Sequence, residues 1–305
     1  MKKKILIIGG TGFIGYHFSK KCLSHKFEVT SLSRSKPSKT RKLKNVKYIF
    51  ADISNKRNLK LKIKKEYDYI VNFGGDVDHH GKNTFKSHFK GCKNLAEIFQ
   101  NKKIKKFIQM GSSVEYGKNK SPHAEKNLIK INPKLNSIYA RAKLSSTKFL
   151  LKLFKNRKFP VTIFRLYLTY GPKQDANRII PFTILQCLKN KEFPCSKGDQ
   201  YRDFIYIDDV VNILFKSLDY KGAEGQIFNI CSNQPVQIKR VINLIKSKCK
   251  GGKPQFGLIL MRKDEVMKFY GDLKKTSRFF NWKPKINLAS GLNRTIKYYE
   301  NNFKN

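Results

Sequence analysis

A short aliphatic segment near the N-terminus ends in a glycine cluster and is followed at once by an amphipathic segment. Ile5 to Ile8 form the aliphatic run, and Gly9, Gly12 and Gly15 follow at intervals of three. Such a run is typical of a parallel strand covered on both faces. Glycines let the backbone turn sharply and approach a phosphate, and the next helix directs its free N–H groups at that phosphate. The order predicts a dinucleotide site; the alternative is a turn that only packs a helix.

The first half of the chain alternates apolar strands with amphipathic helices, which predicts βαβ units and a parallel sheet. The predicted strands are 4–8, 27–32, 46–50, 68–73, 105–110 and 161–167, and the predicted helices are about 13–25, 56–65, 83–101 and 137–156. From Gly171 the alternation stops. The later predictions are helices near 179–190, 237–249 and 289–301, strands at 203–207 and 228–230, and a helix capped by Asp208 and Asp209.

This pattern predicts an α/β fold, a Rossmann-like doubly wound parallel sheet with a smaller, interleaved C-terminal α/β lobe. We expect residues 1–168 plus about 203–230 to form the dinucleotide-binding domain. Residues from about 169–202 plus 231–305 would form the substrate lobe.

The formal net charge of +44 raises the question of a nucleic-acid partner. Only 12 of the 65 basic residues are arginines, and the lysines are spread through every segment. Nucleic-acid readers tend to concentrate arginines beside aromatic platforms. We therefore interpret the charge as lysine-biased composition, expect no nucleic acid, and note that it would steer an anionic substrate toward the protein.

The six cysteines form no C-x-x-C pair and show no metal-ligand spacing with histidine. This predicts reduced thiols, no metal site and a cytoplasmic location. No apolar run approaches the length needed to span a bilayer, so we expect no membrane span.

Tyr139 and Lys143 lie four residues apart in a predicted helix and therefore share a face. An ammonium beside a buried tyrosine favours the phenolate form, which makes the tyrosine a usable general acid and base. The pair follows Ser112 and Ser113, which come directly after a predicted strand, by about 25 residues.

Together with Asp52, the octapeptide 110–117 and the segment 202–210, these residues resemble the extended short-chain dehydrogenase/reductases. This is the family of nucleotide-sugar epimerases, dehydratases and ketoreductases. The resemblance runs from residue 4 to about residue 300. It implies a cytoplasmic homodimer that binds a nucleoside-diphosphate sugar and a nicotinamide dinucleotide.

The resemblance implies a role for each matching residue. Ser112 would hydrogen-bond the reacting oxygen, Tyr139 would transfer the proton, and Lys143 would hold the nicotinamide ribose. The expected cofactor contacts, besides Tyr139 and Lys143, are Gly9, Thr11, Gly12, Phe13, Ile14, Gly15, Ser33, Arg34, Asp52 and Ile53. The expected substrate contacts are Ser113, Arg178, Arg202, Arg262 and His79. Structural alternatives stay open: Ser112 or Asp52 could cap a turn or helix, and Arg262 or His79 could be exposed surface residues.

Departures from the family pattern reduce the number of reactions that this chain is expected to catalyse. Ser113 and Val114 stand where the 4,6-dehydratases carry an Asp and a Glu that perform water elimination, so dehydration would lack its acid and base. Leu168 and His88 each replace an Asn that relatives use, which leaves the detailed substrate pose open.

The end of the second predicted strand bears on the choice of cofactor. Ser33 stands where NAD-preferring relatives carry an Asp that binds the ribose hydroxyls and repels a phosphate. Because Arg34 follows, the sequence favours NADP, with NAD as the alternative.

The leading hypothesis is NADPH-dependent reduction of a nucleoside-diphosphate 4-keto-6-deoxy sugar. The second is a nucleotide-sugar 4-epimerase with tightly bound NAD. A remote third is a non-catalytic nucleotide- or nucleic-acid-binding protein, against which the presence of Ser112, Tyr139 and Lys143 argues.

Overall fold

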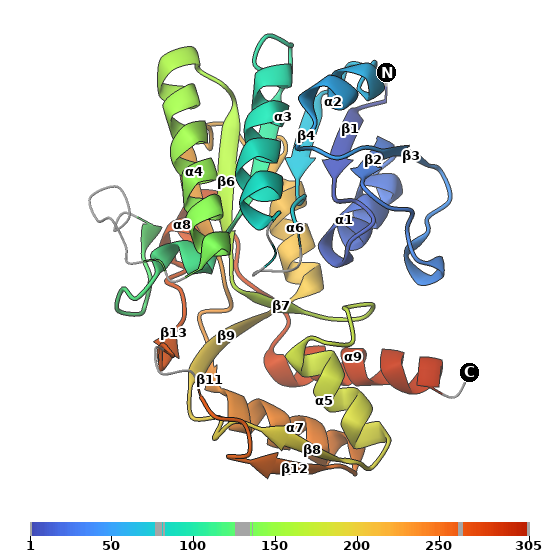
Figure 1. Cartoon of the computed structure of the whole chain (residues 1–305), viewed down its shortest axis with the longest axis vertical. Coiled ribbons are helices and arrows are strands. Elements are labelled where there is room, and N and C mark those ends of the chain that lie inside the picture. The colour runs from blue at the N-terminus through green and yellow to red at the C-terminus, as the bar shows by residue number, and fades with distance from the viewer. Residues whose placement is uncertain are drawn as a thin grey trace.

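The computed structural model describes residues 2–76, 81, 83–125, 135, 137–261 and 265–303. Its main feature is a seven-stranded sheet in which every neighbouring pair is parallel, in the order β10-β6-β5-β4-β1-β2-β3 (Figure 1). The strands are β1 (Lys4–Ile8), β2 (Glu28–Ser33), β3 (Val46–Phe50), β4 (Tyr69–Asn72), β5 (Lys106–Ser112), β6 (Val161–Leu166) and β10 (Gln226–Ile230). The predicted Rossmann-like α/β fold is thus confirmed.

Helices cover both faces of this sheet, as the uninterrupted aliphatic strands require. They are α1 (Phe13–Ser24), α2 (Lys56–Lys62), α3 (Gly91–Phe99), α4 (Ile138–Arg157) and α6 (Ile207–Ser217). Successive side chains of β1 enter different cores: Ile5 and Ile7 pack in one hydrophobic cluster, whereas Leu6 and Ile8 pack in the other. All four are at most 1% exposed, so β1 lies at the centre of the packing.

The strand order reverses at β1, which is flanked by β2 on one side and β4 on the other. In open α/β sheets, ligands bind beyond the carboxyl ends of the strands at such a reversal. The glycine turn, Gly9 to Gly12, lies directly after β1 at this point.

A smaller part of the molecule lies below the sheet in Figure 1 and is built from two short sheets and several helices. Strand β9 pairs with β7, β11 and β13, and β8 pairs with β12. Its elements are β7 (Leu168–Tyr170), α5 (Ile179–Leu188), β8 (Glu192–Cys195), β9 (Tyr201–Tyr206), β11 (Pro235–Gln237), α7 (Ile238–Cys249), β12 (Lys253–Phe256), β13 (Lys268–Phe269) and α9 (Leu288–Phe303). Helix α8 (Lys274–Phe280) instead packs against β10 of the large sheet. The sequence did not predict β7, β8, β11, β12, β13 or α8, because two to seven residues show little periodicity.

Two helical segments differ in detail from the sequence prediction. The helix expected at about 83–101 runs over residues 84–99 and contains a π-helical turn, η2 (Lys86–Lys90), that continues directly into α3. Asp208 and Asp209 lie in the first turn of α6 and do not cap it, because the Asp209 carboxylate accepts hydrogen bonds from the backbone N–H groups of Lys285 and Ile286 (3.0 and 2.9 Å).

Within the described ranges, no helix has both the length and the apolar composition needed to cross a membrane. The six cysteines are free thiols, and five of them are buried.

A buried histidine makes the stability of this fold dependent on pH. His123 is 1% exposed, and burial lowers its pKa to about 4. Between about pH 6.5 and this value the unfolded chain binds more protons than the folded one, so stability falls as the pH falls, by about 3 kcal/mol over the whole window.

We expect His123→Gln to lose less stability than the wild-type protein between about pH 7 and pH 4.5, because glutamine does not titrate there. Urea unfolding at both pH values measures the difference. His25→Gln is the control, since His25 is exposed and its replacement should leave the wild-type dependence unchanged. Equal losses in wild type and His123→Gln would contradict the assignment.

Candidate active site

The glycine turn has the geometry of a phosphate cradle. Gly9 has a φ of +76°, a backbone conformation that favours glycine. A Cβ on Gly15 would overlap the carbonyl oxygen of Gly9, so only glycine lets α1 begin this close to the turn. Gly12 is the first flanking residue of α1, and the first turn of that helix carries no acidic side chain. The positive end of α1 is therefore accessible to a negatively charged group.

The end of β2 is tied to this turn. The Thr11 N–H donates to the Ser33 hydroxyl at 3.4 Å. Arg34 follows with a half-exposed side chain, and its guanidinium lies 3.5 Å from the carboxylate of Asp76, beyond the end of β4. Because β1 lies between β2 and β4, this ion pair reaches across the end of β1.

Asp52 and Ile53 follow β3. The Asp52 carboxylate is exposed and accepts the Ser54 N–H at 2.8 Å, so it forms a local turn, while Asn55 caps α2. Ile53 is buried, and its carbonyl accepts a hydrogen bond from Asn94 on α3 at 2.9 Å. Phe13 and Ile14, the remaining predicted cofactor contacts, form the partly buried start of α1.

Ser112 is the last residue of β5 and begins a short 3₁₀ turn, η3 (Ser113–Tyr116). Its hydroxyl accepts the Val114 N–H at 3.4 Å, and its own N–H donates to Glu115 Oε1 at 2.8 Å. Ser112 therefore caps η3, as the structural alternative expected. The cap fixes its hydroxyl at the carboxyl end of β5 and does not prevent the hydroxyl from donating a hydrogen bond to a substrate.

Tyr139 and Lys143 lie on the first turns of α4, which Ser137 caps by accepting the Ala140 N–H at 3.1 Å. The Lys143 ammonium is buried and donates to the Met110 carbonyl of β5 at 2.8 Å. It lies 5.7 Å from the centre of the Tyr139 ring, while Tyr139 remains partly exposed. The structure thus brings both residues to the end of the strand that carries Ser112.

A buried carboxylate joins these elements. Glu115 accepts the Ser112 N–H through Oε1, and through Oε2 it accepts the hydroxyl of Thr147 (2.8 Å) and Nε of Arg165 (3.0 Å). Glu115 and Arg165 are both fully buried. The sequence analysis gave neither residue a role. Two signals could have found them, the spacing Ser-x-x-Glu of a capping box and an arginine inside an apolar strand, which needs a buried partner.

The predicted substrate residues lie in several places. Ser113 is buried in η3, and Arg178 directly precedes α5 with a partly exposed side chain. Arg202, in β9, donates to the carbonyls of Tyr201 and Val266 at 2.7 and 2.8 Å and pairs with Glu265. These contacts use three of the five N–H donors of the guanidinium. His79 and Arg262 lie outside the described residues.

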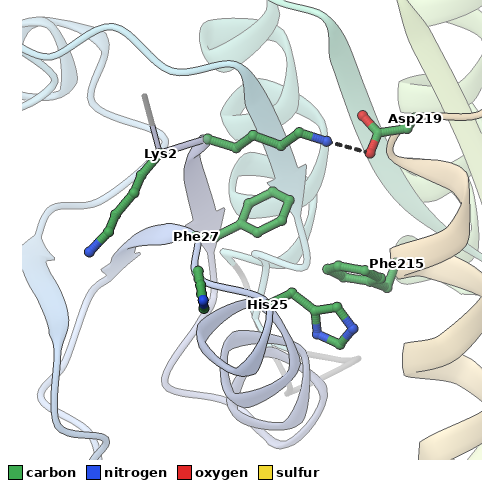
Figure 2. Close-up of a pocket in the computed structure, with 7 residues that line it drawn as sticks. Lys2, His25, Phe27, Phe215 and Asp219 are labelled. Carbon is green, nitrogen blue, oxygen red and sulfur yellow. Dashed lines mark hydrogen bonds and ion pairs between the residues drawn. The ribbon is translucent and has the colours of Figure 1, made fainter.

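A cavity of about 690 Å³ lies elsewhere, at the amino end of β1 (Figure 2). Figure 2 shows His25, Phe27 and Phe215 around it, and the ion pair between Lys3 and Asp219 lies at its edge. Because the glycine turn and Ser112 lie at the opposite, carboxyl ends of the strands, this cavity is not part of the candidate site. Among the described residues, no group of three His, Cys, Asp or Glu side chains is placed to hold a metal ion.

Comparisons with known proteins identify the class. Residues 5–231 match the profile of the NAD-dependent epimerase/dehydratase family, and the chain belongs to this family. A human dTDP-D-glucose 4,6-dehydratase is 26% identical over 99% of this chain and 91% of its own length.

Two solved structures share the fold. A dTDP-glucose 4,6-dehydratase from Bacillus anthracis in complex with NAD superposes with a TM-score of 0.88 at 23% identity, covering 99% of this chain and 98% of its own. A UDP-glucose 4-epimerase from Thermotoga maritima with UDP-glucose gives the same TM-score and identity, covering 98% and 99%. The chain is thus similar to nucleotide-sugar dehydratases and epimerases alike, and it is an enzyme of the short-chain dehydrogenase/reductase type.

The residues present fit a nicotinamide dinucleotide. The glycines let α1 begin close against the turn, since a Cβ on Gly15 would overlap the Gly9 carbonyl, and the start of α1 is free of carboxylates. Tyr139 and Lys143 lie at the carboxyl end of β5, separated from β1 by β4 on the same edge of the sheet, where one bound dinucleotide would extend from the glycine turn to both.

We expect Glu115→Gln to destabilise the fold by about 3–5 kcal/mol, because it leaves the buried Arg165 without a counter-charge. Urea unfolding measures the loss. Glu97→Gln is the matched control: Glu97 pairs with Lys56 at the surface, where a pair is worth about 0–1 kcal/mol. Similar losses in the two variants would contradict the role assigned to Glu115.

Proposed function

We propose that this enzyme reduces the 4-keto group of a nucleoside-diphosphate 4-keto-6-deoxy sugar, using NADPH. The observation that carries the proposal is the convergence of Ser112, Tyr139 and Lys143 at the carboxyl end of β5, on the same edge of the parallel sheet as the glycine turn after β1. When bound, the nicotinamide supplies the hydride; the protein has to supply the proton, the orientation and the binding of the phosphates.

The protein residues then have separate tasks. Ser112, fixed by its position at the start of η3, orients the carbonyl oxygen through a hydrogen bond. Tyr139 donates the proton to that oxygen. Lys143, whose ammonium lies 5.7 Å from the centre of the tyrosine ring, would hold the nicotinamide ribose beside it.

The residues at the start of η3 favour reduction over dehydration. Elimination of water needs an acid and a base aligned with the sugar. Ser113 is a short, buried hydroxyl residue and Val114 is apolar, so this turn presents no carboxylate at either position. The only acidic residue of η3 is Glu115, which is occupied by Thr147 and Arg165.

NADP is the proposed cofactor, with NAD as the alternative. In support, Ser33 leaves room for a ribose phosphate where an Asp would repel it, and Arg34 holds a partly exposed guanidinium beside it. Arg41 is only 13% exposed and is bound to the Lys173 carbonyl and to Asp175, whereas the Arg34 side chain is 51% exposed and its ion pair with Asp76 is long (3.5 Å), so Arg34 is the better placed arginine.

A 4-epimerase is the second candidate, and the likeness to the T. maritima UDP-glucose 4-epimerase favours it. An epimerase regains its cofactor in every turnover and retains it. Purified protein that releases about one NAD per chain on denaturation would overturn the reductase proposal. Consumption of one NADPH per 4-keto sugar reduced would support it.

We further propose a division of the chain into two binding regions, a location and an oligomeric state. Residues 1–168 plus about 203–230 would bind the dinucleotide, and residues from about 169–202 plus 231–305 would bind the nucleotide sugar. The enzyme would work as a cytoplasmic homodimer; the free, mostly buried thiols are compatible with a reducing compartment.

We expect Tyr139→Phe to lower turnover by about 10²–10⁴-fold, because it removes the proton donor. Cofactor affinity should stay within about twofold, since the ring is retained. Steady-state kinetics and fluorescence titration with NADPH measure the two effects. Tyr48→Phe, which removes a hydroxyl that binds the Leu43 N–H, is the control. Wild-type turnover in Tyr139→Phe would contradict the assignment.

We expect Arg34→Ala to weaken NADP binding by about 10-fold or more, because it removes a charged partner of the ribose phosphate. Binding of NAD, which lacks this phosphate, should change little. Calorimetric titration with both dinucleotides gives the ratio of the Kd for NADP to the Kd for NAD. Lys36→Ala lowers the local charge equally, and as a control it should leave the ratio unchanged. An equal loss for both dinucleotides in Arg34→Ala would argue against NADP.

A further inference from the structure

His88 lies in a π-helical turn next to the candidate site. It is in the middle of η2, the π-helical turn that runs directly into α3, and its side chain is buried. A π-turn contains more residues than an α-turn, so it directs its side chains differently from a continuous helix. Here the change of direction brings an imidazole toward α4, which packs against η2.

Contacts from two other segments hold this histidine in place. Its Nε2 lies 3.0 Å from the Asp76 carbonyl oxygen, within hydrogen-bonding distance. Its own carbonyl accepts the Ser146 hydroxyl of α4 at 3.1 Å. A Cβ on Gly75, which has a φ of +141°, would overlap the imidazole, so the ring occupies space that only glycine leaves.

The His88 ring also contacts the ring of Tyr139. The rings of His88 and Tyr139 meet edge to face, with their centres 4.9 Å apart and an interplanar angle of 74°. This is a favourable aromatic geometry. On α4 itself, the Lys143 ammonium lies 5.7 Å from the centre of the same tyrosine ring. The Tyr139 ring is therefore close to one group on its own helix and to one group on η2.

We propose that His88 is a positioning residue for Tyr139. Its imidazole, fixed by Asp76, Gly75 and Ser146, sets where the tyrosine ring lies relative to the end of β5. The catalytic part of this inference rests on the proposed function, in which Tyr139 transfers the proton. Proton transfer depends steeply on the position of the donor, and a misplacement of about 1 Å can cost about 10²-fold in rate.

The kinetic test compares His88→Ala with His88→Phe. We expect His88→Ala to lower kcat by about 10- to 10²-fold, with the KM of the sugar nucleotide and the cofactor affinity within about twofold of wild type. His88→Phe keeps a ring edge against Tyr139 and should recover most of the lost kcat. Phe89→Leu is the matched control, because Phe89 lies in the same turn but packs on Phe85 and Phe149.

A second measurement does not depend on turnover. In protein labelled with ¹³C at the tyrosine ring carbons, the Tyr139 signal is assigned by its loss in Tyr139→Phe. We expect His88→Ala to shift this signal and Phe89→Leu to leave it in place. If the wild-type protein turns over no nucleotide sugar, the proposed function fails, and this signal alone decides whether His88 positions Tyr139.

Three results would overturn the positioning role. One is wild-type kcat in His88→Ala with an active wild-type enzyme. Another is an unshifted Tyr139 signal in His88→Ala. The third is a loss of kcat in Phe89→Leu as large as that in His88→Ala, because it would reflect general damage to η2. If His88→Ala fails to fold, His88→Phe and His88→Leu give the same comparison, with and without an aromatic ring edge.

Discussion

The Glu115 carboxylate is the interaction on which the geometry of the candidate site depends. A fully buried carboxylate is costly unless every oxygen is bound, and this one binds a backbone N–H, a hydroxyl and a guanidinium. Those three partners come from the end of β5, from α4 and from β6. Their common acceptor therefore sets the spacing between Ser112 and the helix that carries Tyr139. Packing alone would fix this spacing less sharply, because apolar contacts have no preferred direction.

Other buried carboxylates bind the backbone in the same way. Asp203 accepts the N–H groups of Ser232 and Asn233, Asp209 those of Lys285 and Ile286, and Glu125 that of Asn229. Burial raises the pKa of Asp203 to about 6. With 21 acidic residues against 65 basic ones, acids are scarce in this chain. Several of them hold loops to strands, a task that a lysine cannot perform because it has no acceptor.

The parts that could be predicted from the sequence are those whose physical cause is local. The aliphatic run of β1 and the glycines that follow it each act over a few residues, and the structure confirms the strand and the helix start that they predict. The contacts of His88 with Asp76 and Tyr139 join segments 12 and about 50 residues apart, so no spacing indicates them. The same holds for β13, which has two residues and owes its conformation to its pairing with β9.

The late position of β10 has a consequence for how the chain folds as it is synthesised. The strand follows β7, β8 and β9 in the sequence, yet it pairs with β6 in the large sheet. A nascent chain that ends before residue 226 therefore leaves one side of β6 unpaired, although the other strands of that sheet are complete. An open strand edge is prone to pair with other chains. The large sheet is completed only after β7, α5, β8 and β9 of the smaller part have been synthesised, so the first elements of the smaller part are present before the large sheet has its last strand.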